Sequence, residues 1–141
     1  MPSRRKLVTL IAAAVPQLKR QLVIDAIDVA TVPGEVPVVE IDFPGSERQS
    51  IYVTDATSQL LCICYLWRDA DVKPRRRAKL LETLLDLNPS VPLSAFGRIG
   101  EHFVLVGALG PNATAQDMAL ELATLSDNAR DAIATLAEFL E

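Results

Sequence analysis

Apolar residues recur at helical spacing near both ends of the chain, which has 141 residues. The first stripe consists of Leu7, Leu10, Ile11, Ala14 and Leu18. The second stripe consists of Met118, Leu122, Leu125, Ala129, Ala132, Leu136 and Leu140. Thr114 and Asp117 precede the second stripe at the spacing of a capping box, with Asp in place of the usual Glu. The pattern predicts an amphipathic helix at the start and a last helix that runs to the C-terminus.

The segment after the first helix follows the two-residue period of β-strands. In residues 38–43 apolar and acidic side chains alternate, which predicts a strand with one solvent-exposed face. Residues 50–54 and 59–67 predict two further strands, and the second is apolar on both faces, so we expect it at the centre of the sheet. Residues 22–30 fit either a continued helix or a first strand, and their β-branched side chains favour the strand.

A second amphipathic helix is predicted over residues 71–88. Leucines recur there at helical spacing and give the segment a wide apolar face. Pro74 is tolerated because it falls in the first turn, where a backbone N–H has no partner within the helix. Pro89 ends the helix, since the residue before a proline disfavours helical geometry.

The segment after this helix predicts more of the sheet. We expect a short extended piece at residues 93–96, a turn at 97–100 and a buried strand at 102–108. The element order is therefore α-β-β-β-β-α-β-β-α, or one strand fewer. This order predicts an α+β fold, in which residues 1–141 form a single domain with helices packed on an antiparallel β-sheet of about five strands.

Composition is that of an ordinary globular domain. Apolar residues make up 50% of the chain, enough for one core. The formal net charge of -4 argues against nucleic acid as a partner. The two cysteines, Cys62 and Cys64, point the same way from one strand, so we expect buried core thiols rather than a disulfide. Two thiols and one distant histidine fall short of a zinc site, and a cytoplasmic location fits the free thiols best.

Candidate catalytic residues do not form a known constellation. His102 is the single histidine and has no Cys or Ser at a familiar spacing, which favours a structural role. Ser94 lacks the G-x-S-x-G turn of a hydrolase nucleophile. Asp69 and Asp71 precede a helix start, where exposed N–H groups stabilise carboxylates. We therefore expect no enzyme, no metal and no cofactor, with a small-molecule pocket between helix and sheet as an alternative.

Charge is distributed unevenly along the chain. Residues 1–20 hold five basic and no acidic side chains, and residues 73–79 hold five more basic ones. The last helical segment holds six acidic side chains, Glu121 among them, against Arg130 alone. These segments are either solvated faces or a surface that docks an oppositely charged protein or an anionic membrane. The candidate partner-binding residues are Arg4, Arg5, Lys6, Lys73, Arg75, Arg76, Arg77 and Lys79.

The first fifteen residues also resemble a targeting signal. Their basic start and short apolar run have the layout of a secretory signal. Pro16, Lys19 and Arg20 interrupt the apolar run, which stays far short of the roughly 20 residues of a membrane-spanning helix. An amphipathic first helix is the favoured interpretation, and binding of that basic helix to an anionic membrane surface is an alternative.

Several short motifs of the second half occur in a recognisable order. They are Leu87-Asn88 before a proline turn, Pro92 to Ser94, Phe96, Gly97 with Gly100, Gly107 to Leu109, and Leu125 to Asn128. In this order and spacing, residues 80–135 resemble the YjfI-like family of uncharacterised bacterial proteins. The first 70 residues match that family in layout alone.

The resemblance implies a fold and a partner. The layout is similar to that of type III secretion chaperones and YbjN-like proteins, which are α/β domains with an antiparallel sheet, helices on one side and frequent homodimers. YjfI-like proteins tend to be encoded beside relatives of phage-shock protein A, a helical membrane-remodelling protein. The resemblance thus implies a homodimeric adaptor or chaperone for a phage-shock-protein-A-like partner in membrane stress, cytoplasmic or peripheral to the inner membrane.

Overall fold

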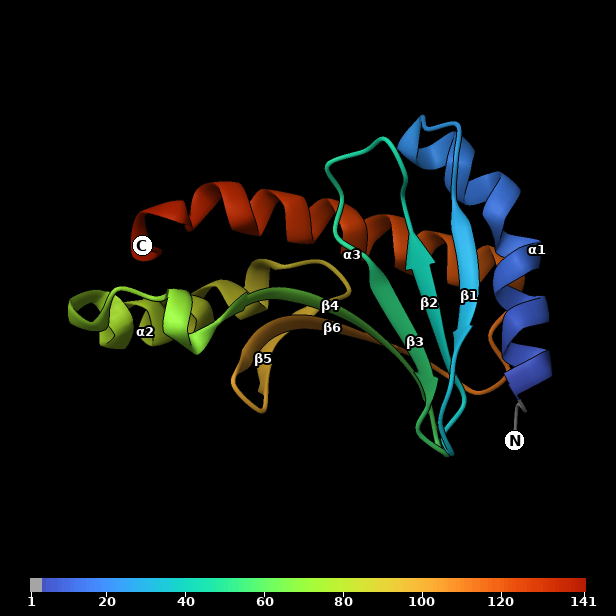
Figure 1. Ribbon diagram of the computed structural model, residues 1–141, viewed down its shortest axis with the longest axis horizontal. Coiled ribbons are helices and arrows are strands. Elements are labelled where there is room, and N and C mark those ends of the chain that lie inside the picture. The colour runs from blue at the N-terminus through green and yellow to red at the C-terminus, as the bar shows by residue number, and fades with distance from the viewer. Residues whose placement is uncertain (1–3) are drawn as a thin grey trace.

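The computed structural model describes residues 4–141, except for the side chains of Arg4 and Arg5. Six antiparallel strands form one sheet in the order β1-β2-β3-β4-β6-β5 (Figure 1). The strands are β1 (Asp28–Val32), β2 (Val38–Asp42), β3 (Ile51–Asp55), β4 (Leu60–Arg68), β5 (Ala95–Ile99) and β6 (His102–Leu109). The α-helices are α1 (Arg4–Leu22), α2 (Arg77–Leu87) and α3 (Ala115–Thr135).

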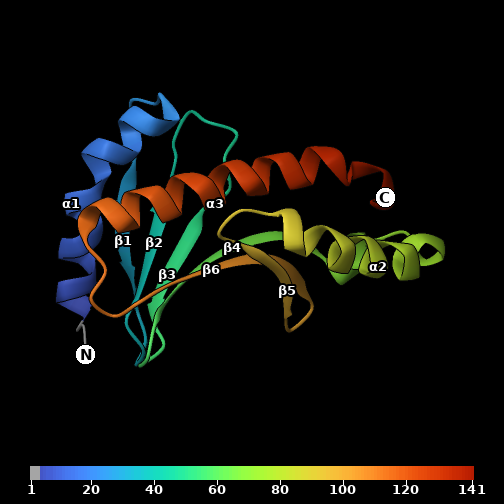
Figure 2. The same cartoon turned by 180° about the vertical axis from the view of Figure 1, so that it is seen from behind.

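The core lies between one face of the sheet and the helices. Alternate residues of the strands, such as Val39, Ile41 and Val53, are fully buried against α1 and α3. The apolar stripes of both helices point into this layer, and Leu7 and Leu122 are fully buried. Figure 2 shows α3 running across the sheet beside α1. Burial of these apolar side chains provides the main free energy that holds the helices on the sheet.

The predicted α+β class and antiparallel sheet are confirmed, with six strands instead of about five. β4 lies between β3 and β6, so its predicted central place is correct. Residues 22–30 divide between the end of α1 and the start of β1, because the chain reverses at Val23, which adopts a φ of 55°. A strand over that whole range is therefore wrong.

Three predicted boundaries in the second half are also wrong. α2 begins at Arg77 instead of Asp71, because Pro74–Arg76 forms a separate 3-10 turn. The predicted turn at 97–100 is mostly strand, since Gly97 pairs with Val104 inside the β5–β6 hairpin. The last helix ends at Thr135, and a 3-10 turn at Ala137–Phe139 follows it.

The capping box before α3 is confirmed. The backbone N–H of Asp117 donates to the Thr114 hydroxyl over 3.1 Å, and the backbone N–H of Thr114 donates to the Asp117 carboxylate over 3.0 Å. Each bond satisfies a backbone donor that the first helical turn leaves without a partner. The shorter Asp side chain can therefore replace the usual Glu here.

Candidate functional site

The loop between α2 and β5 is held against α3 by two asparagines. Asn88 accepts a hydrogen bond from the backbone N–H of Phe96 over 2.7 Å, which fixes the start of β5. Asn128 of α3 donates to the carbonyl of Pro92 over 2.9 Å and to the hydroxyl of the buried Ser94 over 3.2 Å. These bonds hold the loop close to α3 and place Phe96 at the centre of an apolar surface.

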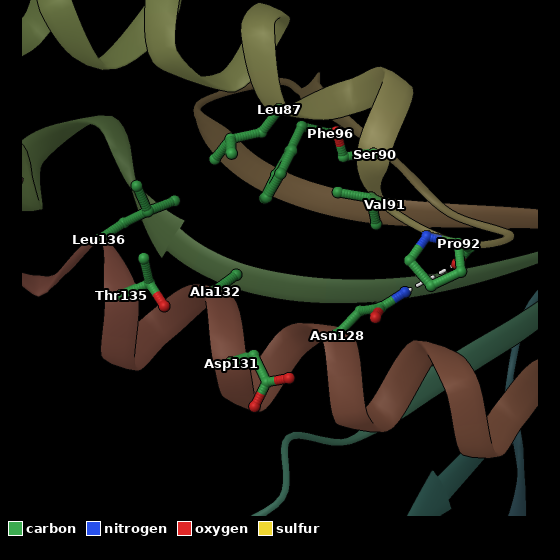
Figure 3. A pocket seen from close by; sticks show the side chains of 10 residues that line it. All are labelled: Leu87, Ser90, Val91, Pro92, Phe96, Asn128, Asp131, Ala132, Thr135 and Leu136. Carbon is green, nitrogen blue, oxygen red and sulfur yellow. Dashed lines mark hydrogen bonds between the residues drawn. The ribbon is translucent and has the colours of Figure 1, made fainter.

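One apolar hollow lies between this loop and the C-terminal half of α3. It has a volume of about 220 Å³. Leu87, Val91 and Phe96 face Ala132 of α3 and Leu136, the residue after α3, across it (Figure 3). Its polar lining comes from a few side chains at its margin: Ser90, Asn128, Asp131 and Thr135.

A second apolar hollow lies on the other side of Phe96. It measures about 290 Å³ and is lined by Leu81, Leu84 and Leu85 of α2 together with Phe96, Gly97, Arg98 and Phe103 of the sheet. Leu85, one of these lining residues, has 71% of its surface exposed. Both hollows are shaped and lined to accept apolar side chains. They bring together no set of acid, base and nucleophile.

Most of the basic side chains predicted at α2 are engaged within the chain. Arg77 donates to Asp69 over 3.2 Å, and Arg76 lies 3.6 Å from the Glu138 carboxylate with its guanidinium over the Phe139 ring. Lys73 donates to the Glu138 carbonyl over 2.9 Å, and Lys79 pairs with Glu82 at 3.5 Å. Arg75 is exposed, and the structure of residues 4–141 gives it no charged partner.

The two predicted basic segments lie at opposite ends of the molecule, near the N-terminus and at the start of α2 (Figure 1). Lys6 is exposed at the start of α1, whereas the side chains of Arg4 and Arg5 lie outside the described residues. The apolar stripe of α1 is buried against the sheet and α3. Membrane insertion of this stripe would therefore require α1 to leave the core.

The cysteines, the histidine and the two aspartates that were considered as catalytic or metal-binding candidates all make contacts that stabilise the fold. Cys62 and Cys64 are buried free thiols, as predicted, and burial raises the pKa of Cys64 to about 12. His102 packs edge-on against the Tyr65 ring at 5.2 Å. Asp69 binds Arg77 and Arg98, and Asp71 accepts the backbone N–H of Arg68.

The described part of the chain holds neither a cluster of metal ligands nor a helix that could span a membrane. No group of three or more His, Cys, Asp or Glu side chains there could hold a metal ion. Among the same residues, every helix is too short or too polar to cross a membrane.

Glu121 departs from the expected acidic helix surface. Its side chain points inward from α3, and only 3% of the residue is exposed. It fits because Gly107 of β6 lies opposite, where a Cβ atom would come within 2.5 Å of Glu121 Oε2. Burial raises the pKa of Glu121 to about 7. In the sequence Glu121 precedes the apolar residues Leu122 and Leu125 and looks like one more acidic residue of the helix. Its burial could have been inferred only from Gly107, which leaves room for its side chain.

The structure defines an α+β domain with a six-stranded antiparallel sheet, three α-helices and two apolar hollows beside Phe96. Residues 12–140 match the model of the family described as "Uncharacterized protein conserved in bacteria (DUF2170)", and the chain belongs to this family. The match carries this description and not the YjfI-like name. Comparison with curated proteins gave no match.

Two solved structures share the fold. YbjN from E. coli, named as a candidate transcription regulator, has a TM-score of 0.64 at 13% identity, covering 99% of this chain and 96% of that one. A chain of the heterodimeric ExoU–SpcU complex of the Pseudomonas aeruginosa type III secretion system has a TM-score of 0.53 at 18% identity, covering 95% of this chain and 97% of that one. At such identities the likeness establishes the fold alone.

Proposed function

We propose that this protein is a non-enzymatic adaptor or chaperone-like domain whose partner inserts apolar side chains into the two hollows beside Phe96. The observation that carries the proposal is the pair of apolar hollows meeting at one aromatic side chain, with the exposed Leu85 lining one of them. Apolar anchors in such pockets dominate the binding energy of many protein interfaces. The similar chain in the ExoU–SpcU complex belongs to a heterodimer, which supports a protein partner.

The finer proposal names the partner. The YjfI-like resemblance of residues 80–135 supports a helical, phage-shock-protein-A-like membrane-stress protein. An amphipathic helix inserts side chains of one face at spacings of three and four residues, which suits two adjacent hollows. Arg75, the exposed member of the basic cluster at α2, lies outside the hollows, where it is free to contact acidic side chains of that helix. The protein would act in the cytoplasm or at the inner membrane, as a homodimer.

The test is a titration of the purified phage-shock-protein-A-like protein from the same organism. Leu85→Glu should weaken binding at least about ten-fold, because it places a charge beside an apolar interface. Leu120→Glu is the matched control, since Leu120 is 51% exposed on the N-terminal half of α3, away from the hollows. Absence of binding by the wild type would contradict the named partner. Equal binding by both variants would contradict the hollows as its site.

The homodimer needs a separate measurement. Sedimentation equilibrium of the wild type should give twice the mass of the 15.3 kDa chain. A monomer at concentrations well above those in the binding titration would contradict this part of the proposal, while leaving the partner site open to its own test.

A further inference from the structure

One whole face of the sheet has no helix of residues 4–141 packed on it (Figures 1 and 2). α1 and α3 cover the opposite face, and α2 contributes to the hollow at Phe96 and Phe103 on that same opposite face. The strand register assigns alternate residues to the uncovered face. They are Asp28, Ala30 and Val32 of β1, Val38, Glu40 and Asp42 of β2, Tyr52 and Thr54 of β3, Leu61, Ile63, Tyr65 and Arg68 of β4, His102, Val104, Val106 and Ala108 of β6, and Ala95, Gly97 and Ile99 of β5.

The uncovered face is apolar over β4, β6 and β5. Leu61 pairs with Ala108, and Ile63 pairs with Val106, which in turn pairs with Ala95. Leu61, Ile63 and Val106 keep partial contact with solvent, and Ala95 and Ala108 are exposed. Neighbouring apolar side chains across three strands form a patch of the kind that marks an interaction surface.

The same face is acidic over β1 and β2. Asp28 pairs with Asp42, and Glu40 lies one register step further along β2. The Tyr52 hydroxyl donates to Glu40 over 2.9 Å, and the Ser50 hydroxyl donates to Asp42. Neither bond neutralises the carboxylates. Arg68 is the one Lys or Arg assigned to this face; it lies at the far end of β4, away from β1 and β2, and pairs with Asp71 at 3.4 Å. The field is therefore negative over β1 and β2, along one side of the apolar patch.

Aromatic rings join the acidic and apolar parts. Tyr52 contacts Tyr65 edge-on, with ring centroids 5.7 Å apart, and Tyr65 contacts His102 in the same way at 5.2 Å. Tyrosine rings offer an apolar body and a π-face that attracts cations. This row of three rings therefore suits a partner that carries both apolar and basic side chains.

We propose that this face docks a basic amphipathic helix of another protein. Its apolar side chains would cover β4, β6 and β5, and its Lys or Arg side chains would lie over Asp28, Glu40 and Asp42. A helix on an antiparallel sheet is the layer arrangement that the chain itself uses on the opposite face. A second copy fits less well, because each face brings Asp28, Glu40 and Asp42 against one basic side chain, Arg68, which already pairs with Asp71. This surface is distinct from the hollows at Phe96.

The first test uses two labelled helical peptides of 18 residues with the same leucine pattern, one with Lys and one with Glu at the polar positions. Fluorescence anisotropy should show binding of the Lys peptide and not of the Glu peptide, weakening as salt is raised. Asp28→Lys should reduce Lys-peptide affinity by about five-fold. Asp86→Lys, an equal charge change at an exposed residue of α2, should leave it unchanged. If Asp28→Lys and Asp86→Lys weaken binding equally, the peptide responds only to the net charge of the protein, and the proposal is wrong.

The second test addresses the apolar part. Ala108→Lys, at an exposed site of the apolar patch opposite Leu61, should reduce Lys-peptide affinity by about ten-fold or more, because the longer side chain blocks the apolar contact and repels the lysines of the peptide. Ala134→Lys, at an exposed site on α3, is the control, and thermal midpoints of both variants confirm folding. A change of oligomeric state in Ala108→Lys alone would instead assign the face to a second copy and overturn the proposal. Leu85→Glu should bind the peptide normally, which separates this surface from the hollows.

Discussion

At the scale of single residues, Glu121 and Gly107 form a matched pair inside the core. The carboxyl group of Glu121 occupies the space above Gly107, and among the described residues Glu121 Oε2 is buried with no hydrogen-bond partner. The titratable group identified next to it is the thiol of Cys62, whose pKa is raised by burial and by the negative charge of Glu121. A buried carboxylate without a cation is costly, so the carboxyl group holds its proton to higher pH than usual.

The pH dependence of stability should reveal this carboxyl group. The pKa of Glu121 is raised from 4.5 to about 7 in the folded protein, so the folded state binds the proton more tightly than the unfolded chain. Its contribution to the free energy of unfolding is therefore full below about pH 4.5 and declines as pH rises to about 7. The full decline should be roughly 3–4 kcal/mol, of which about 2–3 kcal/mol falls between pH 5 and pH 8.

Urea unfolding of Glu121→Gln at pH 5 and pH 8 checks this prediction. The variant stays neutral, so its stability relative to wild type should improve between the two pH values by that amount. Asp131→Asn, which changes an exposed carboxyl group of α3, should show no such improvement. A difference between Glu121→Gln and wild type that is equal at both pH values would contradict a carboxyl group that titrates near 7.

Gly107→Ala tests the close approach itself. The added Cβ would lie 2.5 Å from Glu121 Oε2, and overpacking of this kind costs about 1–3 kcal/mol. The same substitution in a Glu121→Ala background should cost less than about 0.5 kcal/mol, because the obstructing atoms are gone. Gly97→Ala is the control, since its Cβ would meet nothing closer than a methyl group of Val104 at 3.8 Å. Equal costs in both backgrounds would show that the carboxyl group is not the obstacle.

At the scale of elements, α3 is tied to the loop between β2 and β3 through one arginine. Arg48 donates to the Ser126 hydroxyl over 2.9 Å and to the Asp127 carboxylate over 2.7 Å, and its side chain is only 5% exposed. Arg130 reaches the same carboxylate from the solvent side at 3.6 Å. The buried contact should matter much more than the exposed one, because solvent screens the second.

Arg48→Leu should lower the free energy of unfolding by about 2 kcal/mol, since it removes the buried donor to Ser126 and leaves Asp127 with the exposed Arg130. Arg130→Leu should change it by less than about 0.5 kcal/mol. Chemical denaturation of the two variants measures both values. Hydrogen exchange in the 43–50 loop should rise in Arg48→Leu alone. A smaller loss of stability for Arg48→Leu than for Arg130→Leu would contradict the tie between the loop and α3.

The elements that the sequence predicts well are those with long periodic patterns. α3 with its Thr114 cap and the central β4 follow from spacing alone, because burial on one or both faces leaves a clear apolar period. Shorter elements are harder to predict from the sequence, because they contain too few residues to show a period. Gly97 suggested a turn but lies in β5, where the edge of the sheet tolerates a glycine. Pro74 fits a helix start but begins a separate 3-10 turn.

At the scale of the whole molecule, the site depends on contacts that no local pattern contains. Several motifs behind the YjfI-like resemblance come together around the first hollow, where Asn88 and Asn128 hold the loop that carries Phe96, whereas Gly107 lies opposite Glu121. The separation of these motifs in the sequence hid this arrangement. The basic cluster at α2 was visible as a charge run, but its ion pairs with Asp69 and Glu138 depend on the fold. Net charge therefore indicates a surface without telling which side chains remain available to a partner.

Within the basic cluster, Arg75 and Arg76 should behave differently when replaced by Glu. Arg75 is exposed and outside the ion pairs of residues 4–141, so Arg75→Glu should weaken binding of the proposed acidic helical partner about five-fold and leave the thermal midpoint unchanged. Arg76→Glu should also lower the thermal midpoint by a few degrees, because it removes the contacts with Glu138 and the Phe139 ring.

Arg20→Glu, an equal charge change at an exposed site on α1, is the control for both variants. Because α1 and α2 lie at opposite ends of the molecule, this control separates the local contact from the change in net charge (Figure 1). Partner titrations and thermal melts of the three variants measure both properties. If Arg75→Glu and Arg20→Glu weaken binding equally, the partner responds to the total charge of the protein and the cluster at α2 is not its docking site. If Arg75→Glu weakens partner binding and Arg20→Glu does not, the partner lies over the start of α2, within reach of the hollows beside Phe96.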